Sequence, residues 1–265
     1  MIVDGKAIAL RIYNELKNEV THISHMPHLT VFTCAPNFET QKYLALKRKK
    51  AFEIGIEVQV VDLQDTCTTD EVIRAIERSS MQTDGIIIQL PFPHHIEIAK
   101  VLQAIPKTLD VDAMHYDGTS DVVLPPVVGA IMEIAKQHDV LFATQEVVVV
   151  GKGMLVGLPA SIWCKKQGAN VHVVDKSTQD IEILIKKAQI LILGAGVPGL
   201  IIPAMLKDGV CIFDAGTSEE GGILKGDANP QCALKSSLFT PVPGGIGPIT
   251  VAVLLRNLIT LTKAQ

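Results

Sequence analysis

Tyr43 and Lys47 have side chains that could carry out acid–base chemistry, and they lie one helical turn apart in the segment ETQKYLALKRKKAFEIG. At this i, i+4 spacing, a hydroxyl and an ammonium can meet on one face of a helix. Lys47 also interrupts an apolar stripe at helical spacing that is made by Leu44, Ala51 and Ile54. A lysine that faces the wall of a binding site is partly desolvated, which favours its neutral form and suits it to proton transfer. The alternative is a solvated basic face, on which the charge of Lys47 stays in water.

Two further polar residues are expected where the strands of a sheet end. Gln89 closes the apolar run in DGIIIQLPFP, which reads as a buried strand followed by a loop that two prolines fix. Ligands of parallel α/β sheets bind beyond the carboxyl ends of the strands, where the Gln89 amide can orient a neighbouring side chain. Asp112, in LDVDAMH, lies in another such loop, where a carboxylate can accept two hydrogen bonds from a heterocycle. An Asx turn or a helix cap would use Asp112 equally well.

A glycine turn in the second half of the chain predicts a nucleotide site. The strand-like run EVVVV leads into GKGMLVGLP and then into a helical pattern, with glycines at Gly151, Gly153 and Gly157. In such a turn, backbone N–H groups and the helix dipole can hold a pyrophosphate. The spacing is one residue longer than the dinucleotide fingerprint, so a tight turn without a ligand is the alternative.

Charged residues near this turn give opposing predictions for the nucleotide. Asp175 ends the next strand, where an acid takes the ribose hydroxyls of NAD and repels the 2′-phosphate of NADP. Lys152 and Lys176 favour NADP, because either cation can neutralise that phosphate.

Helical and strand patterns alternate along the chain, which predicts an α/β protein with mostly parallel sheets and helices on their faces. The segment 110–126 reads as a loop, and a second α/β unit follows a linking helix. The expected helices are 5–20, 39–55, 69–79, 127–138, one that follows GKGMLVGLP and ends at Gly168, and 249–262. The expected strands are LTVFTCA, EVQVVDL, DGIIIQL, EVVVV, VHVV, ILIL and VCIF.

The composition argues against several classes of function. The 265 residues contain 24 basic and 28 acidic side chains, a net charge of −4, so no general attraction to nucleic acid or to an anionic membrane is expected. The five cysteines lack metal-ligand spacing and are interpreted as reduced core thiols, and no metal site is expected. Glycines and prolines interrupt the uncharged segment 188–206, which argues against a membrane helix. A cytoplasmic enzyme that acts on a small molecule is therefore expected.

Four segments, in order along the chain, carry a resemblance to a known family. They are YLALKRK at 43–49, DGIIIQLPFP at 84–93, DVD at 110–112 and TPVPGGIGPITV at 240–251. Together they resemble the bifunctional methylenetetrahydrofolate dehydrogenase/methenyltetrahydrofolate cyclohydrolase family of the FolD type. The resemblance spans nearly the whole chain.

The resemblance implies two α/β domains with mostly parallel sheets and a cleft between them. Residues 1–126 and 249–265 would form the folate-binding catalytic domain. Residues 127–248 would form a Rossmann-like NAD(P)-binding domain, through which a homodimer is expected.

The resemblance also implies roles for individual residues. Lys47 matches the catalytic lysine, Tyr43 its partner on the same helix and a substrate contact, and Gln89 the glutamine that orients the lysine. Asp112 matches the aspartate that holds the pterin ring. The loop that closes over folate corresponds to 241–248, with Pro243, Gly244 and Gly247 as substrate contacts. The cofactor contacts would be Gly151, Lys152, Gly153, Asp175, Lys176 and Thr217.

Two departures from the family pattern concern the cofactor. Gly153 stands where the family usually has serine, and Asp175 stands where it commonly has histidine. NADP is expected from the resemblance, and NAD is kept as the alternative because of Asp175.

The expected function is therefore oxidation of 5,10-methylenetetrahydrofolate to the methenyl compound with NAD(P)+, followed by hydrolysis to 10-formyltetrahydrofolate, in one-carbon metabolism and purine biosynthesis. A monofunctional dehydrogenase is one alternative. A non-catalytic folate- or nucleotide-binding protein is another, because the nucleotide turn is altered and the loop before Leu124 is short. An amino-acid dehydrogenase with a catalytic lysine would leave the PVPGG segment unexplained.

Overall fold

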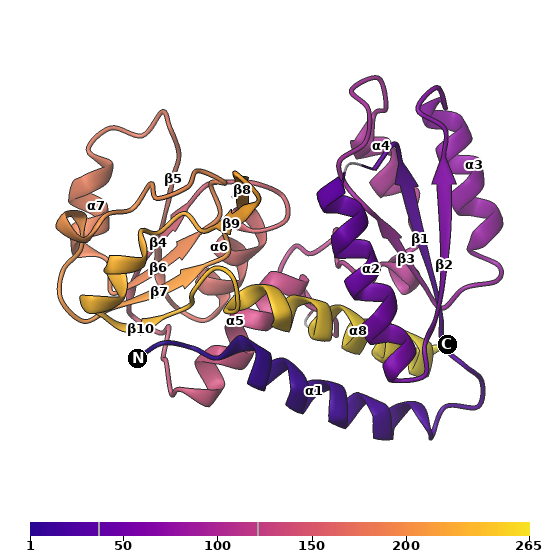
Figure 1. Cartoon of the computed structure of the whole chain (residues 1–265), viewed down its shortest axis with the longest axis horizontal. Coiled ribbons are helices and arrows are strands. Elements are labelled where there is room, and N and C mark those ends of the chain that lie inside the picture. The colour runs from indigo at the N-terminus through magenta and orange to yellow at the C-terminus, as the bar shows by residue number, and fades with distance from the viewer. Residues whose placement is uncertain (37, 121) are drawn as a thin grey trace. The chain divides into compact units, whose positions relative to one another are not determined.

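The structure is a computed structural model that describes residues 1–36, 38–120 and 122–265 (Figure 1). Backbone contacts divide the chain into two compact units. The Lys47 unit consists of Arg11–His115, Val122–Leu124 and Val251–Gln265. The Gly151 unit consists of Met1–Leu10, Tyr116–Asp121 and Pro125–Thr250. Each unit is described by itself.

The Lys47 unit contains a three-stranded parallel sheet in the order β2-β1-β3. The apolar run of β1 lies at its centre and is almost wholly buried, as expected for a parallel strand. The strands are β1 (His28–Cys34), β2 (Glu57–Leu63) and β3 (Gly85–Ile88).

Helices cover both faces of this sheet. Phe32 and Ile86 belong to a buried cluster that includes Val72 of α3 (Thr69–Ser79). Gly85 points to the opposite face, where an added Cβ would overlap the side chain of Leu258 on α8 (Ile246–Ala264). The remaining helical segments that carry residues of this unit are α1 (Gly5–Val20), α2 (Phe38–Glu53), α4 (Ile98–Gln103) and the 3-10 turn η1 (Lys107–Leu109).

The Gly151 unit contains a five-stranded parallel sheet in the order β10-β7-β6-β4-β5. Because β4 lies between β5 and β6, the strand order reverses at β4, and ligands of open α/β sheets bind at such a switch point. The strands are β4 (Glu146–Val150), β5 (Asn170–Val174), β6 (Ile190–Leu193), β7 (Val210–Asp214) and β10 (Ser236–Phe239).

Helices and 3-10 turns connect the parallel strands of this unit, as in a doubly wound sheet. The helices are α5 (Pro126–Gln137), α6 (Gly157–Lys166) and α7 (Ile181–Lys187), the 3-10 turns are η2 (Pro203–Met205) and η3 (Pro230–Leu234), and a short hairpin joins β8 (Ser218–Glu220) to β9 (Ile223–Lys225).

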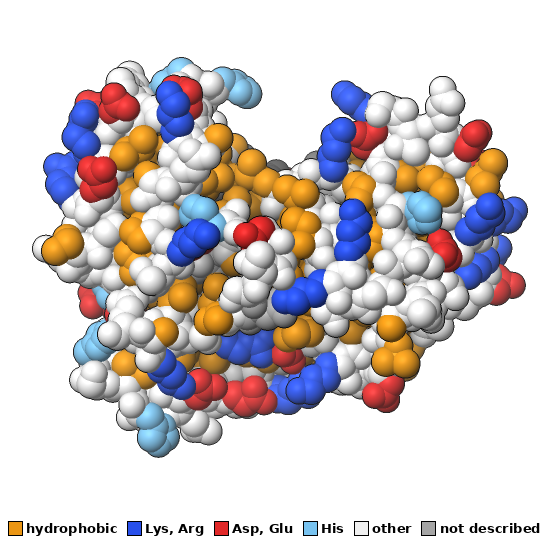
Figure 2. Space-filling view, turned by 180° about the vertical axis from the view of Figure 1, so that it is seen from behind, with side chains coloured by type: hydrophobic (Ala, Val, Ile, Leu, Met, Phe, Trp, Pro, Cys, Tyr) orange, Lys and Arg blue, Asp and Glu red, His pale blue; other side chains and the backbone are white. Residues whose placement is uncertain are grey.

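One helix in the described part of the chain, α8, is long and apolar enough to cross a membrane by length and composition. Of its most apolar stretch, 72% is buried inside the structure, as is usual for a core helix. The uncharged segment 188–206 instead forms β6, a turn and η2. On the face that Figure 2 shows, basic and acidic side chains are interspersed rather than gathered in a patch of one sign.

Candidate active site

Lys47 is a buried lysine in the Lys47 unit, with 5% of its surface exposed. The apolar residues of its stripe, Leu44, Ala51 and Ile54, are buried with it. The lysine therefore lies on the packed face of α2 and not on the solvated one. Burial lowers the pKa of Lys47, because a desolvated ammonium is less stable than the neutral amine.

Two predicted neighbours hold the amine. The Nζ atom of Lys47 donates a hydrogen bond of 2.9 Å to Oε1 of Gln89. It also lies 5.0 Å from the centroid of the Tyr43 ring, within the range of a cation–π contact. Spacing along the helix predicted that these two side chains meet. The contact that the structure gives is with the ring face.

The backbone that follows β3 fixes the position of Gln89. Its backbone N–H donates to the carbonyl of Phe32 at 2.9 Å, which extends the pairing of β3 with β1. Its side-chain Nε2 contacts the carbonyl of Leu90 at 3.4 Å. The side-chain oxygen of Gln89 is therefore the end that faces Lys47, and its amide nitrogen faces the carbonyl of Leu90.

Asp112 interacts electrostatically with Lys47. It keeps part of its surface exposed, yet it is enclosed by enough protein that burial raises its pKa to about 6. The charge of Lys47 opposes this rise and the charge of Asp110 adds to it. A carboxyl group and an amine, each with its charged form disfavoured by burial, thus share one site.

The structure also brings in Asp110 and His115, which the sequence reasoning did not select as a pair. Asp110 is 3% exposed, and its Oδ2 accepts hydrogen bonds from the backbone N–H of His115 at 3.1 Å and contacts His115 Nδ1 at 2.7 Å. Its Oδ1 is buried without a hydrogen-bond partner in the described part of the chain. The spacing of five residues between Asp110 and His115 matches no regular period, so the sequence gives no signal for this pair. The loop turns back at Ala113, which has a positive φ of 50°.

The glycine turn of the Gly151 unit brings several backbone segments close together. Gly151 has a φ of 97°, and an added Cβ would lie 2.5 Å from the carbonyl oxygen of Gly194. A Cβ on Gly157 would overlap the carbonyl of Gly151, so α6 can begin this close only with glycine at its first position. A Cβ on Gly153 would meet no described atom within 4 Å. The turn therefore leaves open space at Gly153, where backbone amides at the start of a helix can face an anion.

The opposing charges predicted for the ribose end meet in one ion pair. Lys152 Nζ lies 2.5 Å from Oδ2 of Asp175. The other oxygen of Asp175 accepts hydrogen bonds from the backbone N–H of Ser177 at 2.9 Å and from its hydroxyl at 2.6 Å. Lys152 and these donors hold the pKa of Asp175 well below its usual range. Lys176 is exposed beside them.

The remaining predicted contacts lie in the Gly151 unit. Pro243 and Gly244 lie between β10 and α8, and Gly247 lies in the first turn of α8. Gly244 has a φ of 106°. The backbone N–H of Gly5 donates to the carbonyl of Gly244 at 2.9 Å. Thr217 is exposed directly after β7 and its turn. The structure thus groups Tyr43, Lys47, Gln89 and Asp112 in one unit and the predicted cofactor contacts in the other.

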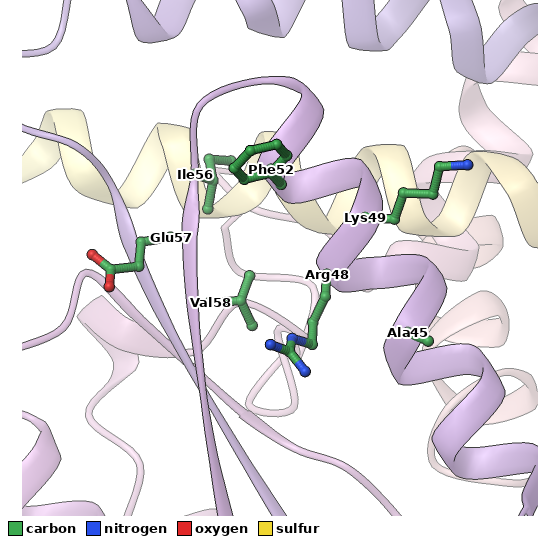
Figure 3. A pocket seen from close by; sticks show the side chains of 7 residues that line it. All are labelled: Ala45, Arg48, Lys49, Phe52, Ile56, Glu57 and Val58. Carbon is green, nitrogen blue, oxygen red and sulfur yellow. The ribbon is translucent and has the colours of Figure 1, made fainter.

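A separate hollow of about 480 Å³ lies between α2 and β2. Its side chains do not converge on a common point: Lys49 and Glu57 point away from one another, and Phe52 is 84% exposed (Figure 3). We therefore assign no chemistry to this hollow. Among the described residues, no group of three or more His, Cys, Asp or Glu side chains is placed to hold a metal ion.

Comparisons with known proteins identify the family. The sequence matches two family models, described as tetrahydrofolate dehydrogenase/cyclohydrolase catalytic domain over residues 3–112 and as the NAD(P)-binding domain of the same family over residues 125–265. The bifunctional protein FolD of Exiguobacterium sibiricum is 33% identical over 275 residues, which cover 99% of each chain.

Solved structures agree in fold over the whole chain. The bifunctional FolD of Campylobacter jejuni has a TM-score of 0.95 at 30% identity, covering 100% of this chain and 99% of that one. The FolD of Trypanosoma brucei, determined in complex with NADP and an inhibitor, has a TM-score of 0.93 at 31% identity, covering 100% and 97%. These findings confirm the resemblance and the two-domain α/β fold with a Rossmann-like second domain. The chain belongs to the tetrahydrofolate dehydrogenase/cyclohydrolase family.

Proposed function

We propose that this chain oxidises 5,10-methylenetetrahydrofolate to 5,10-methenyltetrahydrofolate with NADP+ and hydrolyses the product to 10-formyltetrahydrofolate. The observation that carries the proposal is the buried amine of Lys47, bonded to Gln89 and coupled to Asp112. Family models for both the catalytic and the NAD(P)-binding domain match the chain, and its relatives are named bifunctional. Both points favour two activities over a single dehydrogenase step or a binding protein.

In the oxidation, the chain supplies binding and orientation. The bound nicotinamide supplies the acceptor for the hydride. Asp112 and Tyr43 hold the folate, together with Pro243, Gly244 and Gly247. No side chain has to exchange a proton for a hydride to leave the methylene carbon, so positioning is the main contribution of the protein to this step.

In the hydrolysis, Lys47 accepts and donates a proton. Water adds to the methenyl carbon of the cation and must lose a proton as the new C–O bond forms. A neutral amine at Lys47 accepts that proton, and the resulting ammonium donates it to the ring nitrogen as the C–N bond breaks. The hydroxyl of the adduct loses its own proton to water as the formyl C=O forms, so one proton is released overall. Gln89 keeps the amine in place, and the pKa of Lys47, lowered by burial, favours the neutral form that this role requires.

The residues of the glycine turn fit a dinucleotide. The turn at Gly151 and the open space at Gly153 suit a pyrophosphate, and Lys152 and Lys176 place two cations near the ribose end. Thr217 lies in the turn after β7, at the same edge of the sheet. NADP fits these cations and is the cofactor present in the Trypanosoma brucei relative. NAD is the weaker alternative, because the carboxylate of Asp175 would repel the 2′-phosphate of NADP.

The proposal includes an assembly, a domain division and a location. A homodimer through the nucleotide domain is supported by β5, an edge strand of the five-stranded sheet on which Val173 is 40% exposed.

Residues 1–126 and 249–265 form the folate-binding domain in this proposal, and residues 127–248 form the nucleotide domain. A cytoplasmic location suits the five cysteines, all of which are unpaired and buried.

Two matched assays on the purified chain test the proposal. Reduced nucleotide should appear when methylenetetrahydrofolate and NADP+ are supplied together. Added methenyltetrahydrofolate should be hydrolysed without any nucleotide. Oxidation without hydrolysis would leave only the dehydrogenase, and the absence of both activities would refute the proposal.

A further inference from the structure

Two buried aspartates of the Gly151 unit lie outside all the residues assigned above. Asp227 is 0% exposed and Asp214 is 1% exposed. Asp214 ends β7, and Asp227 follows the β8–β9 hairpin. In the part of the chain that the structure describes, every hydrogen bond to either carboxylate comes from a backbone amide.

Asp227 accepts hydrogen bonds from three consecutive backbone amides in the loop that follows β6. Its Oδ2 accepts from the N–H groups of Ala195 at 2.6 Å and Gly196 at 3.2 Å, and its Oδ1 accepts from Val197 at 2.8 Å. Hydrogen bonds from amides to a carboxylate are stronger than those between neutral groups. One side chain thus fixes the conformation of the turn 195–197.

Asp214 in turn fixes Asp227. Its Oδ1 accepts from the backbone N–H groups of Gly216 at 2.9 Å and Asp227 at 3.2 Å, and its Oδ2 accepts from Ala228 at 2.8 Å. Its own N–H donates to the Thr240 hydroxyl at 2.6 Å. The two carboxylates therefore form one network that joins the turns after β6 and β7.

Two glycines let the backbone pass close to these carboxylates. A Cβ on Gly216 would overlap the carboxyl group of Asp227, and a Cβ on Gly226 would overlap that of Asp214. This close approach accounts for the burial of both side chains. It also means that a single added methyl group can displace Asp227 without removing it.

The turn held by Asp227 adjoins the glycine turn of the predicted nucleotide site. Gly194 lies directly before it, and the backbone N–H of Gly194 donates to the carbonyl of Val150 at 2.9 Å. The carbonyl oxygen of Gly194 is the atom that a Cβ on Gly151 would approach to 2.5 Å. The network, the turn 195–197 and the Gly151 turn thus lie in sequence along the carboxyl ends of β7, β6 and β4, the edge at which dinucleotides bind.

We propose that Asp227, supported by Asp214, is a positioning residue for the dinucleotide: it holds the turn 195–197, and through Gly194 the Gly151 turn, in the conformation that binds NADP. The proposal rests on the function proposed above, since it concerns the same nucleotide site. It predicts a defect in nucleotide binding and in oxidation that leaves the hydrolysis of methenyltetrahydrofolate intact, because hydrolysis uses Lys47 and no nucleotide.

The test compares Gly216→Ala and Asp227→Asn with wild type in the full-length protein. Asp208→Asn is the matched control, because it makes the same chemical change on a carboxylate whose side chain is 89% exposed in the same unit. The dissociation constant of NADP is measured by calorimetry, and kcat and KM are measured for both half-reactions. Circular dichroism and thermal melting verify that each variant is folded.

We expect the Kd and KM for NADP to rise by about tenfold or more in both variants. The rate of hydrolysis of added methenyltetrahydrofolate should stay within about twofold of wild type, and Asp208→Asn should match wild type throughout. If Asp227→Asn does not fold, Gly216→Ala decides the question, since it keeps the carboxylate and only displaces it.

Three outcomes would overturn the inference. They are an unchanged Kd for NADP in folded variants, a parallel loss of binding and hydrolysis, and a failure of both variants to fold, since the last two would mean that the pair only stabilises the protein. A wild-type protein that binds NADP but shows neither activity would refute the proposed function alone. The comparison of dissociation constants would then still test the role of Asp227.

Discussion

Replacing Lys47 with methionine separates the chemistry of the amine from the packing of its side chain. Methionine is also long and unbranched, so it can fill the space of the buried lysine stem on α2 with little loss of contact. The substitution removes the ammonium, the cation–π contact with Tyr43 and the 2.9 Å hydrogen bond to Gln89. It also removes the charge that opposes the rise in the pKa of Asp112.

The expected effect on stability is small, because two contributions oppose each other. Leaving the Gln89 oxygen without its donor costs about 1–3 kcal/mol. Removing a buried cation recovers the cost of its desolvation, which is the main reason that the pKa of Lys47 is lowered. We expect the free energy of unfolding to change by less than about 2 kcal/mol.

The expected effect on hydrolysis is large. A general base contributes about 10²–10⁴-fold to rate, so kcat for the hydrolysis of methenyltetrahydrofolate should fall by about 100-fold or more in Lys47→Met. Binding of folate should persist. In wild type the rate should rise with pH as Lys47 loses its proton, and this dependence should vanish from the residual activity of the variant.

Lys49→Met is the matched control, because Lys49 is exposed on the same helix. It should hydrolyse methenyltetrahydrofolate as wild type does. The assay follows the decay of the methenyl chromophore and the binding of folate in the same preparations. A Lys47→Met protein that retains hydrolysis at the rate of the Lys49→Met control would refute the assignment of Lys47 as the proton acceptor.

Three further predictions concern charge and assembly. Asp175→Ser should raise kcat/KM for NADP relative to NAD, because it removes the carboxylate that binds Lys152 and repels a 2′-phosphate; an unchanged ratio in steady-state assays would clear Asp175 of influence. In wild type, burial raises the pKa of Asp112 to about 6 in the folded state. Between about pH 4 and 6 the folded state therefore binds more protons than the unfolded state, and the protein loses stability as pH rises. Asp112→Asn should reduce this loss, because it removes the titrating group. Denaturant melts at several pH values measure this slope, and an equal slope in the variant would contradict the reasoning. Val173→Lys should convert the expected dimer to a monomer in light scattering, since it places a charge on the exposed edge strand β5, and a persisting dimer would move the interface elsewhere.

The parts of the fold that depend on local pattern could be predicted from the sequence. The apolar stripe around Lys47 predicted the buried face of α2. The run EVVVV predicted β4, and the glycines after it predicted the turn that follows. Gln89 could be placed because a strand that ends in a polar residue puts that residue at the ligand edge of the sheet. Each of these inferences uses residues within about one helix or strand of each other.

The contacts between distant segments could not be predicted in this way. Asp227 binds amides that precede it by about thirty residues, and no periodicity links the two segments. The ion pair between Lys152 and Asp175 joins residues that were assigned opposing roles separately. For Tyr43, helical spacing gave the correct face but not which atoms of the ring meet Lys47, because that depends on rotamers set by packing.

The division of α8 between the two units affects the order in which the protein can fold during synthesis. Residues 251–264 belong to the Lys47 unit, where Leu258 packs against Gly85, and Asn257 donates hydrogen bonds to the carbonyls of Val111 and Leu124. The three-stranded sheet is translated early, yet the part of its second face at Gly85 stays uncovered until the ribosome has released these residues. Since domains generally fold as units, the Gly151 unit can finish first, and the growing polypeptide must keep an apolar sheet face from aggregating in the meantime.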